Sequence, residues 1–127
     1  MMDPIKVDIV LLLKNLLRAL HLVLKEKNIE LDFTTSENEI WLDYSENELL
    51  ARFTKLICSI IDYMPDNNTL YFNLGVLRNE AIEYLSVKIK NTGINLKRVT
   101  AIIKNSSLPV TLFSSAANET LLKHVIP

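Results

Sequence analysis

The strongest constraint on the fold is a long amphipathic helix that is followed at once by two alternating strands. Ser45-Glu46-Asn47-Glu48 has the spacing of a capping box, in which the Ser45 side chain accepts from the Glu48 amide and the Glu48 side chain reaches back to the Ser45 amide. Apolar residues then recur every three or four positions until Pro65 stops the helix: Leu49, Phe53, Leu56, Ile57, Ile60 and Met64. The sequence therefore predicts a helix within residues 43–65 that buries one face.

A long antiparallel hairpin is predicted to follow this helix. In residues 70–76, and again in residues 85–89, every second side chain is apolar. Arg78-Asn79-Glu80 provides the turn between the two strands, and Asn91-Thr92-Gly93 ends the second strand. The apolar phase slips at Tyr84, which predicts either a β-bulge or a tyrosine exposed at a sheet edge.

The N-terminal part of the chain predicts one more helix and two short strands. Asp3 can cap a helix that starts at Pro4, where the missing amide donor costs nothing, and the apolar stripe of this helix ends near Lys27. The stripe is wide, so the helix either belongs to the core alone or also packs on a partner. Residues 29–33 and 40–42 have the pattern of strands, with a polar loop between them.

The C-terminal part predicts a short helix over residues 96–107 and two closing strands at residues 110–114 and 120–126. The full order is helix, two short strands, helix, hairpin, helix, hairpin. Such an order predicts an α+β fold, a two-layer sandwich with three helices packed on one face of a mixed, mainly antiparallel sheet. With 127 residues and no repeat or linker, the chain is predicted to form a single domain, residues 1–127.

Composition excludes several classes of function. Fourteen basic and fifteen acidic residues give a net charge of −1 without a basic block, which argues against a nucleic-acid partner. Cys58 is the sole cysteine, so the sequence has neither a disulfide framework nor a metal-ligand set and suits a cytoplasmic location. The apolar run near the N-terminus is interrupted by Lys14 and Arg18, which argues against a signal peptide or a membrane span.

The order of elements resembles the ATP-binding module of bacterial sensor histidine kinases, the GHKL or Bergerat fold. That family has an aspartate before its second helix and then the box N-L-L-x-N-A-x-K-[YF]-[TS]-P; this chain has Asp43 and KLICSIIDYMP at residues 55–65. The family motif D-x-G-x-G falls on NTGIN at residues 91–95, and the closing strands resemble residues 110–115 and 119–127. The resemblance covers nearly the whole chain, but the segment that carries the ATP lid in the family is absent.

The resemblance implies a vestigial nucleotide pocket, because polar residues of the family motifs are replaced. Lys55, Ser59 and Asp62 share the helix face that looks at the nucleotide in the family, and Ser59 stands where the family has its cation-binding asparagine. Asn91 stands where the family has the aspartate that reads adenine, so the charge of that hydrogen bond is lost. Gly93 keeps the first glycine of the motif, and Asn95 replaces the second. The implied pocket residues are Lys55, Ser59, Asp62, Asn91, Gly93 and Asn95.

These replacements imply a pseudokinase, a catalytically inactive domain without cofactor or metal that binds proteins in two-component or phosphorelay signalling. The implied partner is a response regulator, a kinase or a second copy in a homodimer, and it would dock on the vacated surface around Tyr63 or on the exposed side of the first helix. Two alternatives stay open, a nucleotide-sensing domain with weak ATP or ADP binding and a histidine phosphotransferase-like protein. Against the latter, His21 is followed by Leu22 rather than an acidic residue, and His124 has no acidic neighbour.

Overall fold

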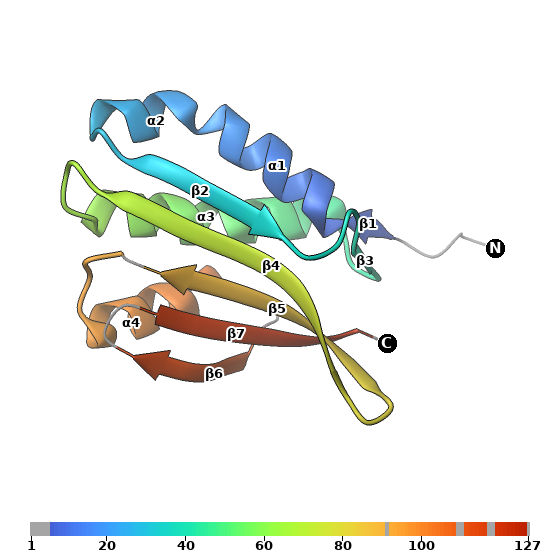
Figure 1. The fold of residues 1–127 in the computed structure, drawn as a ribbon. Coiled ribbons are helices and arrows are strands. Elements are labelled where there is room, and N and C mark those ends of the chain that lie inside the picture. The colour runs from blue at the N-terminus through green and yellow to red at the C-terminus, as the bar shows by residue number, and fades with distance from the viewer. Residues whose placement is uncertain (1–5, 91, 109–110, 117–118, 127) are drawn as a thin grey trace.

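The main sheet of this protein is mixed, as the sequence predicts, and within the described residues it has five strands. The predicted strand at residues 40–42 is not one of them, because it pairs with Val7–Asp8 in a separate sheet. The computed structural model describes residues 6–90, 92–108, 111–116 and 119–126 (Figure 1). The sheet order is β2-β4-β5-β7-β6, with bounds β2 Glu30–Thr35, β4 Thr69–Asn79, β5 Ile82–Lys90, β6 Thr111–Ala116 and β7 Glu119–Ile126. β2 runs parallel to β4, and the other neighbours are antiparallel. The predicted hairpin is β4–β5, and the predicted closing strands are β6 and β7.

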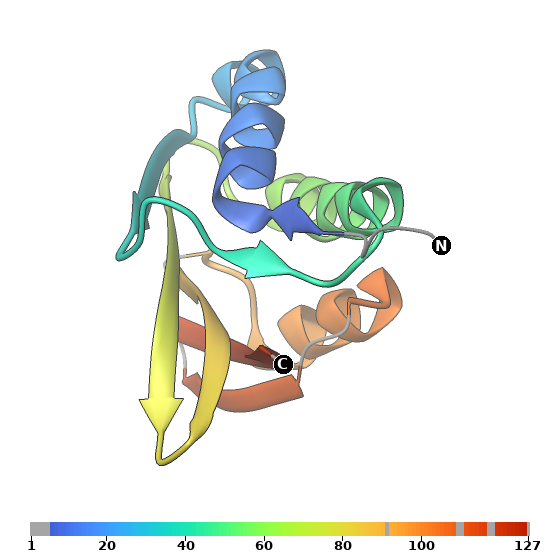
Figure 2. The same cartoon turned by 90° about the vertical axis from the view of Figure 1, so that its right-hand side faces the viewer.

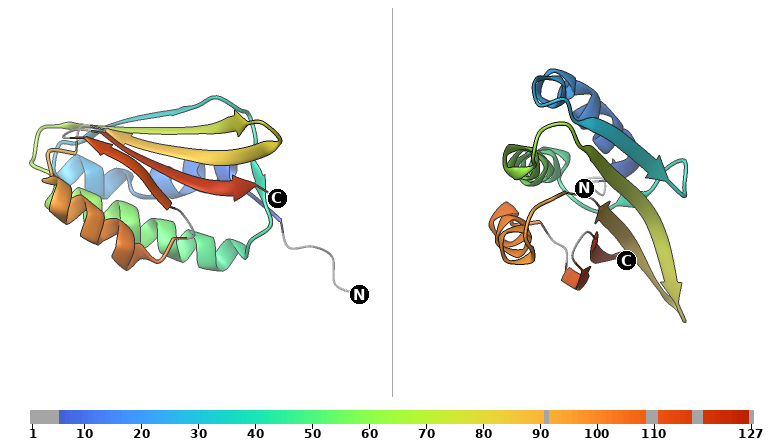
Figure 3. Two further views of the ribbon diagram at one scale, coloured as in Figure 1. Left: turned by 90° about the horizontal axis from the view of Figure 1, so that it is seen from below. Right: turned by 60° about the vertical axis from the view of Figure 1, so that its left-hand side comes forward.

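The helices lie together on one face of the sheet, so the molecule has two layers (Figures 2 and 3). Their bounds are α1 Ile9–Ala19, α2 His21–Glu26, α3 Glu46–Tyr63 and α4 Leu96–Ser106. A small second sheet pairs β1 Val7–Asp8 with β3 Trp41–Leu42 beside the start of α1. This arrangement confirms the predicted α+β two-layer sandwich, with the predicted first helix divided into α1 and α2.

The core lies between the sheet and the helices and follows the predicted alternation. On β4 and β5, every second side chain faces the helices and is buried: Leu70, Phe72, Leu74, Leu85, Val87 and Ile89. The apolar stripe of α3 meets them, and all six predicted stripe residues are buried. Because both layers contribute continuous apolar rows, the two patterns that the sequence predicts share one core.

The apolar alternation of β5 breaks at Tyr84, but neither of the two predicted causes, a β-bulge or an edge position, applies. The β4–β5 register is unbroken from Tyr71↔Lys90 to Asn79↔Ile82, so the predicted bulge is wrong. Tyr84 is also not at a sheet edge, since β5 lies between β4 and β7. The tip of the hairpin extends past the helices (Figure 1), and side chains on both of its faces, such as Ile82, are exposed. The apolar alternation stops because the helical layer stops.

The first helix begins later than the sequence predicts. The predicted cap Asp3 and the predicted first residue Pro4 lie outside the described residues, but the next described segment forms β1 rather than helix. Asp8 is the N-cap of α1, and its Oδ1 accepts from the amides of Val10 at 3.1 Å and Ile40 at 3.0 Å. One carboxylate therefore starts the helix and ties it to the segment before β3, a long-range bond that local sequence does not reveal.

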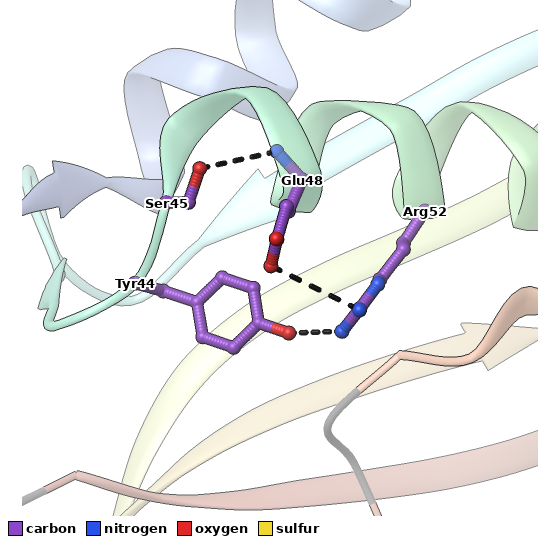
Figure 4. A network of polar contacts seen from close by, with 4 residues as sticks. All are labelled: Tyr44, Ser45, Glu48 and Arg52. Carbon is purple, nitrogen blue, oxygen red and sulfur yellow. Dashed lines mark hydrogen bonds and ion pairs between the residues drawn. The ribbon is translucent and has the colours of Figure 1, made fainter.

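The start of α3 confirms half of the predicted capping box. Ser45 is the N-cap, and its hydroxyl accepts from the Glu48 amide at 3.5 Å. The Glu48 carboxylate lies 3.9 Å from Arg52 Nη2, and Arg52 Nη1 also donates to the Tyr44 hydroxyl (Figure 4). The glutamate therefore supports the first turn through an i, i+4 ion pair instead of the predicted return bond to the serine amide.

Candidate functional site

The segment between β5 and α4 is very short, and it lies against the end of α3. Five residues, 91–95, separate Lys90 from Leu96. Gly93 has φ +69°, and a Cβ placed on it would lie 2.9 Å from both Cγ and Cδ of Pro65. A glycine is required here because the backbone has left-handed φ and touches the ring that follows α3. The structure therefore accounts for Gly93 through packing, independently of any nucleotide.

Asn95 also has a structural role, since it caps α4. Its Oδ1 accepts from the Arg98 amide at 2.9 Å. Three residues earlier along the segment, the Thr92 hydroxyl accepts from the Ile94 amide at 3.2 Å, and both Thr92 and Ile94 are buried. The short connection is thus folded by its own hydrogen bonds and by contact with the core.

α4 packs directly along α3. Its buried residues, Val99, Ile102 and Ile103, face the core. At its first turn, the Arg98 guanidinium carbon lies 4.3 Å from the centroid of the Tyr63 ring, a cation–π contact that joins the two helices. Residues 93–98, which follow β5 closely in the chain, therefore contact the end of α3 at Pro65 and Tyr63, while the Tyr63 side chain stays 52% exposed.

The structure brings some of the predicted pocket residues together and leaves others apart. Lys55, Ser59 and Asp62 share one face of α3, where the first and last are exposed and Ser59 is half-buried. Asn91 lies outside the described residues. Gly93 reaches the end of α3 through Pro65, while Asn95 faces a hollow of about 340 Å³ beside α4. In the described part of the chain, no three His, Cys, Asp or Glu side chains gather as a metal site would require.

Cys58 lies beside this face of α3 but is not activated as a nucleophile. Burial raises the pKa of the Cys58 thiol above its ordinary value, and the nearby Asp62 carboxylate raises it further. Both effects disfavour the thiolate, which is the reactive form. This agrees with the absence of a helical histidine partner in the sequence.

Lys27 is a residue of this region that the sequence does not reveal. Its Nζ donates to three carbonyl oxygens at the end of α3, those of Ile61 at 2.6 Å, Asp62 at 3.1 Å and Met64 at 2.6 Å. The carbonyls of the last turn of a helix lack regular intrahelical amide partners, and here the Ile61 carbonyl accepts from the Met64 amide only at 3.3 Å. A cation at this end also opposes the negative end of the helix dipole. The sequence signals that Pro65 ends the helix, but it does not tell which distant residue satisfies the freed carbonyls.

A second hollow lies away from the predicted pocket, between α1–α2 and the edge strand β2. It has a volume of about 760 Å³ and an apolar floor with basic residues along its rim. Its lining includes Leu31 and Phe33 of β2 and Lys14 and Arg18 of α1. The wide apolar stripe of the first helix is the one sequence feature that pointed toward this side of the molecule.

Within the described residues, no helix has the length and apolar character needed to cross a bilayer.

Comparison with known proteins gives similarity in structure alone. No protein-family model matches the sequence, and no curated protein does. The nucleotide-free catalytic domain of the histidine kinase ThkA superposes with a TM-score of 0.66 at 11% identity, covering 99% of this chain and 97% of that domain. The cytoplasmic segment of the histidine kinase QseC gives a TM-score of 0.65 at 11% identity, covering 100% of this chain and 81% of that one.

A third similar structure is that of ThkA in complex with the response regulator protein TrrA. Its TM-score is 0.66 at 9% identity, over 97% of this chain and 42% of that one. At identities this low, the superpositions establish a shared fold, and any shared chemistry must be argued from the residues of the site. The chain has the histidine kinase-type ATPase fold.

Proposed function

We propose that this protein is a domain with the histidine kinase-type ATPase fold that carries out neither ATP hydrolysis nor phosphotransfer and acts by binding another protein in phosphorelay signalling. The observation that carries the proposal is the five-residue connection between β5 and α4, with α4 packed directly on α3. In the family that the sequence resembles, that position holds the ATP lid. Here the same position is occupied by a short, hydrogen-bonded link.

The remaining residues provide few groups that could bind a nucleoside triphosphate. Binding a triphosphate requires backbone amides, often rich in glycine, and a cation held by oxygen ligands. In this chain Gly93 packs on Pro65, Asn95 uses its side chain to cap α4, and Ser59 replaces the amide ligand. Each lost charge-assisted contact removes about 1.5–3 kcal/mol of binding free energy, so two losses weaken binding by roughly two to four decades.

A partner that is itself a signalling protein fits the fold best. ThkA, whose catalytic domain has the same fold, forms a complex with a response regulator. We extend this class of partner to the present chain: a response regulator, a kinase, or a second copy of the domain. The exposed residues Lys55, Asp62 and Tyr63 on α3 are the surface that nucleotide and lid have vacated, and they are one proposed contact.

Isothermal titration calorimetry with a non-hydrolysable ATP analogue and Mg²⁺ tests the proposal. We expect no binding tighter than a dissociation constant of about 100 μM, which corresponds to about −5.5 kcal/mol. An ATP-binding histidine kinase catalytic domain, titrated under the same conditions, is the positive control. Tighter binding by this chain would refute the proposal and would support the nucleotide-sensing alternative.

A further inference from the structure

β2 is an edge strand with a free backbone side. The sheet order places it at the end of the sheet, and within the described residues its strand partner is β4 alone (Figure 1). The Glu30 amide donates to the Asn68 carbonyl at 2.9 Å, and the Ser36 amide donates to the Leu74 carbonyl at 3.0 Å, both toward β4. Since successive residues of a strand point their amides to opposite sides, Leu31, Phe33 and Thr35 present their N–H and C=O groups outward.

The floor next to this edge is apolar. Leu31 and Phe33 point their half-buried side chains to the helical side of the sheet, where they pack against the core. Leu17 of α1 and Leu24 of α2 complete the floor of the hollow described above. A volume of about 760 Å³ is in the range of sites that accept several side chains of a ligand.

The rim of the same hollow is predominantly basic, with one carboxylate, that of Glu30 at the start of β2, among its lining side chains. Lys14, Arg18, His21 and Lys25 line it and recur at steps of four, three and four residues, which places them along one flank of α1 and α2. All four are exposed. Among the described residues, none of the three basic side chains Lys14, Arg18 and Lys25 forms an ion pair.

We propose that this groove binds an extended, acidic segment of a protein partner, which pairs with β2 as a sixth strand. Outward backbone groups supply strand pairing, the floor accepts apolar side chains, and the basic rim selects Glu and Asp. An α-helix would leave the outward N–H and C=O groups of β2 unused, because its own backbone groups are paired internally. The proposal deepens the proposed function and rests on it, since it names one surface and the chemistry of the partner.

A second copy is a poorer occupant than an acidic segment. If two β2 edges paired across a two-fold axis, the basic stripes of both copies would lie on the same face of the joined sheet and would approach each other. Like charges at such an interface are repulsive. A segment of opposite charge gains from the same arrangement.

Fluorescence anisotropy with synthetic peptides tests the proposal on the whole chain. The probe is a fluorescein-labelled ten-residue peptide that alternates Glu with Val or Leu, and we expect a dissociation constant of about 10–100 μM at low salt. Binding should weaken at high salt, because the rim charges are exposed. A matched peptide with Lys in place of Glu should not bind.

Two sets of variants locate the contact. The double charge reversal Arg18→Glu with Lys25→Glu should weaken binding at least tenfold while leaving the thermal unfolding midpoint close to that of the original chain. The matched control, Lys97→Glu with Lys104→Glu on the exposed side of α4, changes the net charge equally and should leave binding unchanged.

N-methylation of the peptide tests for strand pairing. Methylating every second amide removes donors that point in one direction. One of the two alternate sets should abolish binding, and the other should leave it within about threefold.

Any of three binding results would overturn the proposal: no binding of the acidic peptide, equal binding to the Arg18→Glu/Lys25→Glu variant, or equal effects of both N-methylated sets. Dimerisation through β2 in sedimentation, lost in the same variant, would also overturn it. None of these results bears on the nucleotide titration, so the proposed function can stand if the groove proposal fails.

Discussion

Replacing Gly93 by alanine should destabilise the fold, whether or not any nucleotide is present. A residue with a Cβ at φ +69° costs about 1 kcal/mol relative to glycine. The added Cβ would also lie 2.9 Å from two carbon atoms of the Pro65 ring, and such overpacking costs about 1–2 kcal/mol. We therefore expect Gly93→Ala to lower the free energy of unfolding by about 2–3 kcal/mol.

Urea and thermal denaturation measure this effect. For a chain of this length, the entropy of unfolding is about 0.27 kcal/mol/K, so the midpoint Tm should fall by about 8–11 °C. The control is Gly75→Ala in β4, where φ is not positive and the new Cβ would lie 3.1 Å from the Ser36 hydroxyl oxygen. That hydroxyl belongs to an exposed loop side chain that can rotate away, so this control should change stability by less than about 1 kcal/mol.

A double-mutant cycle separates the two contributions to the Gly93 effect. Pro65→Ala removes both ring carbons that the new Cβ would meet, so it should recover about 1–2 kcal/mol in the Gly93→Ala background. The strain from positive φ should persist. A change below 0.5 kcal/mol in Gly93→Ala, or a cycle without coupling to Pro65, would refute the structural role assigned to this glycine.

Four further predictions concern the same region. Lys27→Met keeps the aliphatic stem but removes the Nζ donor from the carbonyls of Ile61, Asp62 and Met64, so it should cost about 2 kcal/mol in thermal denaturation, whereas Lys25→Met should cost less than about 0.5 kcal/mol. Asn95→Ala should cost about 1 kcal/mol in urea denaturation through loss of the α4 cap, and Asn95→Asp should not. Because burial and Asp62 raise the Cys58 pKa, iodoacetamide at pH 8.5 should alkylate the folded protein more slowly than the urea-unfolded one, with modest acceleration in Asp62→Asn. The folded thiol keeps its proton more tightly than the unfolded thiol, so its contribution to stability should decline as pH rises past the ordinary thiol pKa.

Much of the fold follows from patterns within single segments. Ser45 and Pro65 mark both ends of α3, and the alternation in β4 and β5 predicts both strands and the face that each buries. Each of these signals acts over a few residues and is repeated along its element, so one position can vary without changing the outcome. The order of the elements then restricts the fold to a two-layer sandwich.

The candidate site was predicted less well, because most of its residues contact helices or loops that lie far away in the sequence. The sequence places Lys55, Ser59 and Asp62 on one helix face, and the structure agrees. It assigns Gly93 and Asn95 to a vestigial nucleotide pocket, whereas the structure shows one packed on Pro65 and the other capping α4. Whether these residues also retain any affinity for a nucleotide is the subject of the titration above.

By itself, the sequence determines which segments are helix or strand, which faces they bury, and that β5 is joined to α4 without room for a lid. Only the tertiary structure decides that Asp8 joins the start of α1 to Ile40, that Lys27 caps α3, and that β2 has an open edge beside a basic rim. The physical reason is the distance along the sequence over which each kind of interaction acts. Periodicity and capping are local, whereas a hydrogen bond between residues more than thirty positions apart depends on how the whole chain packs.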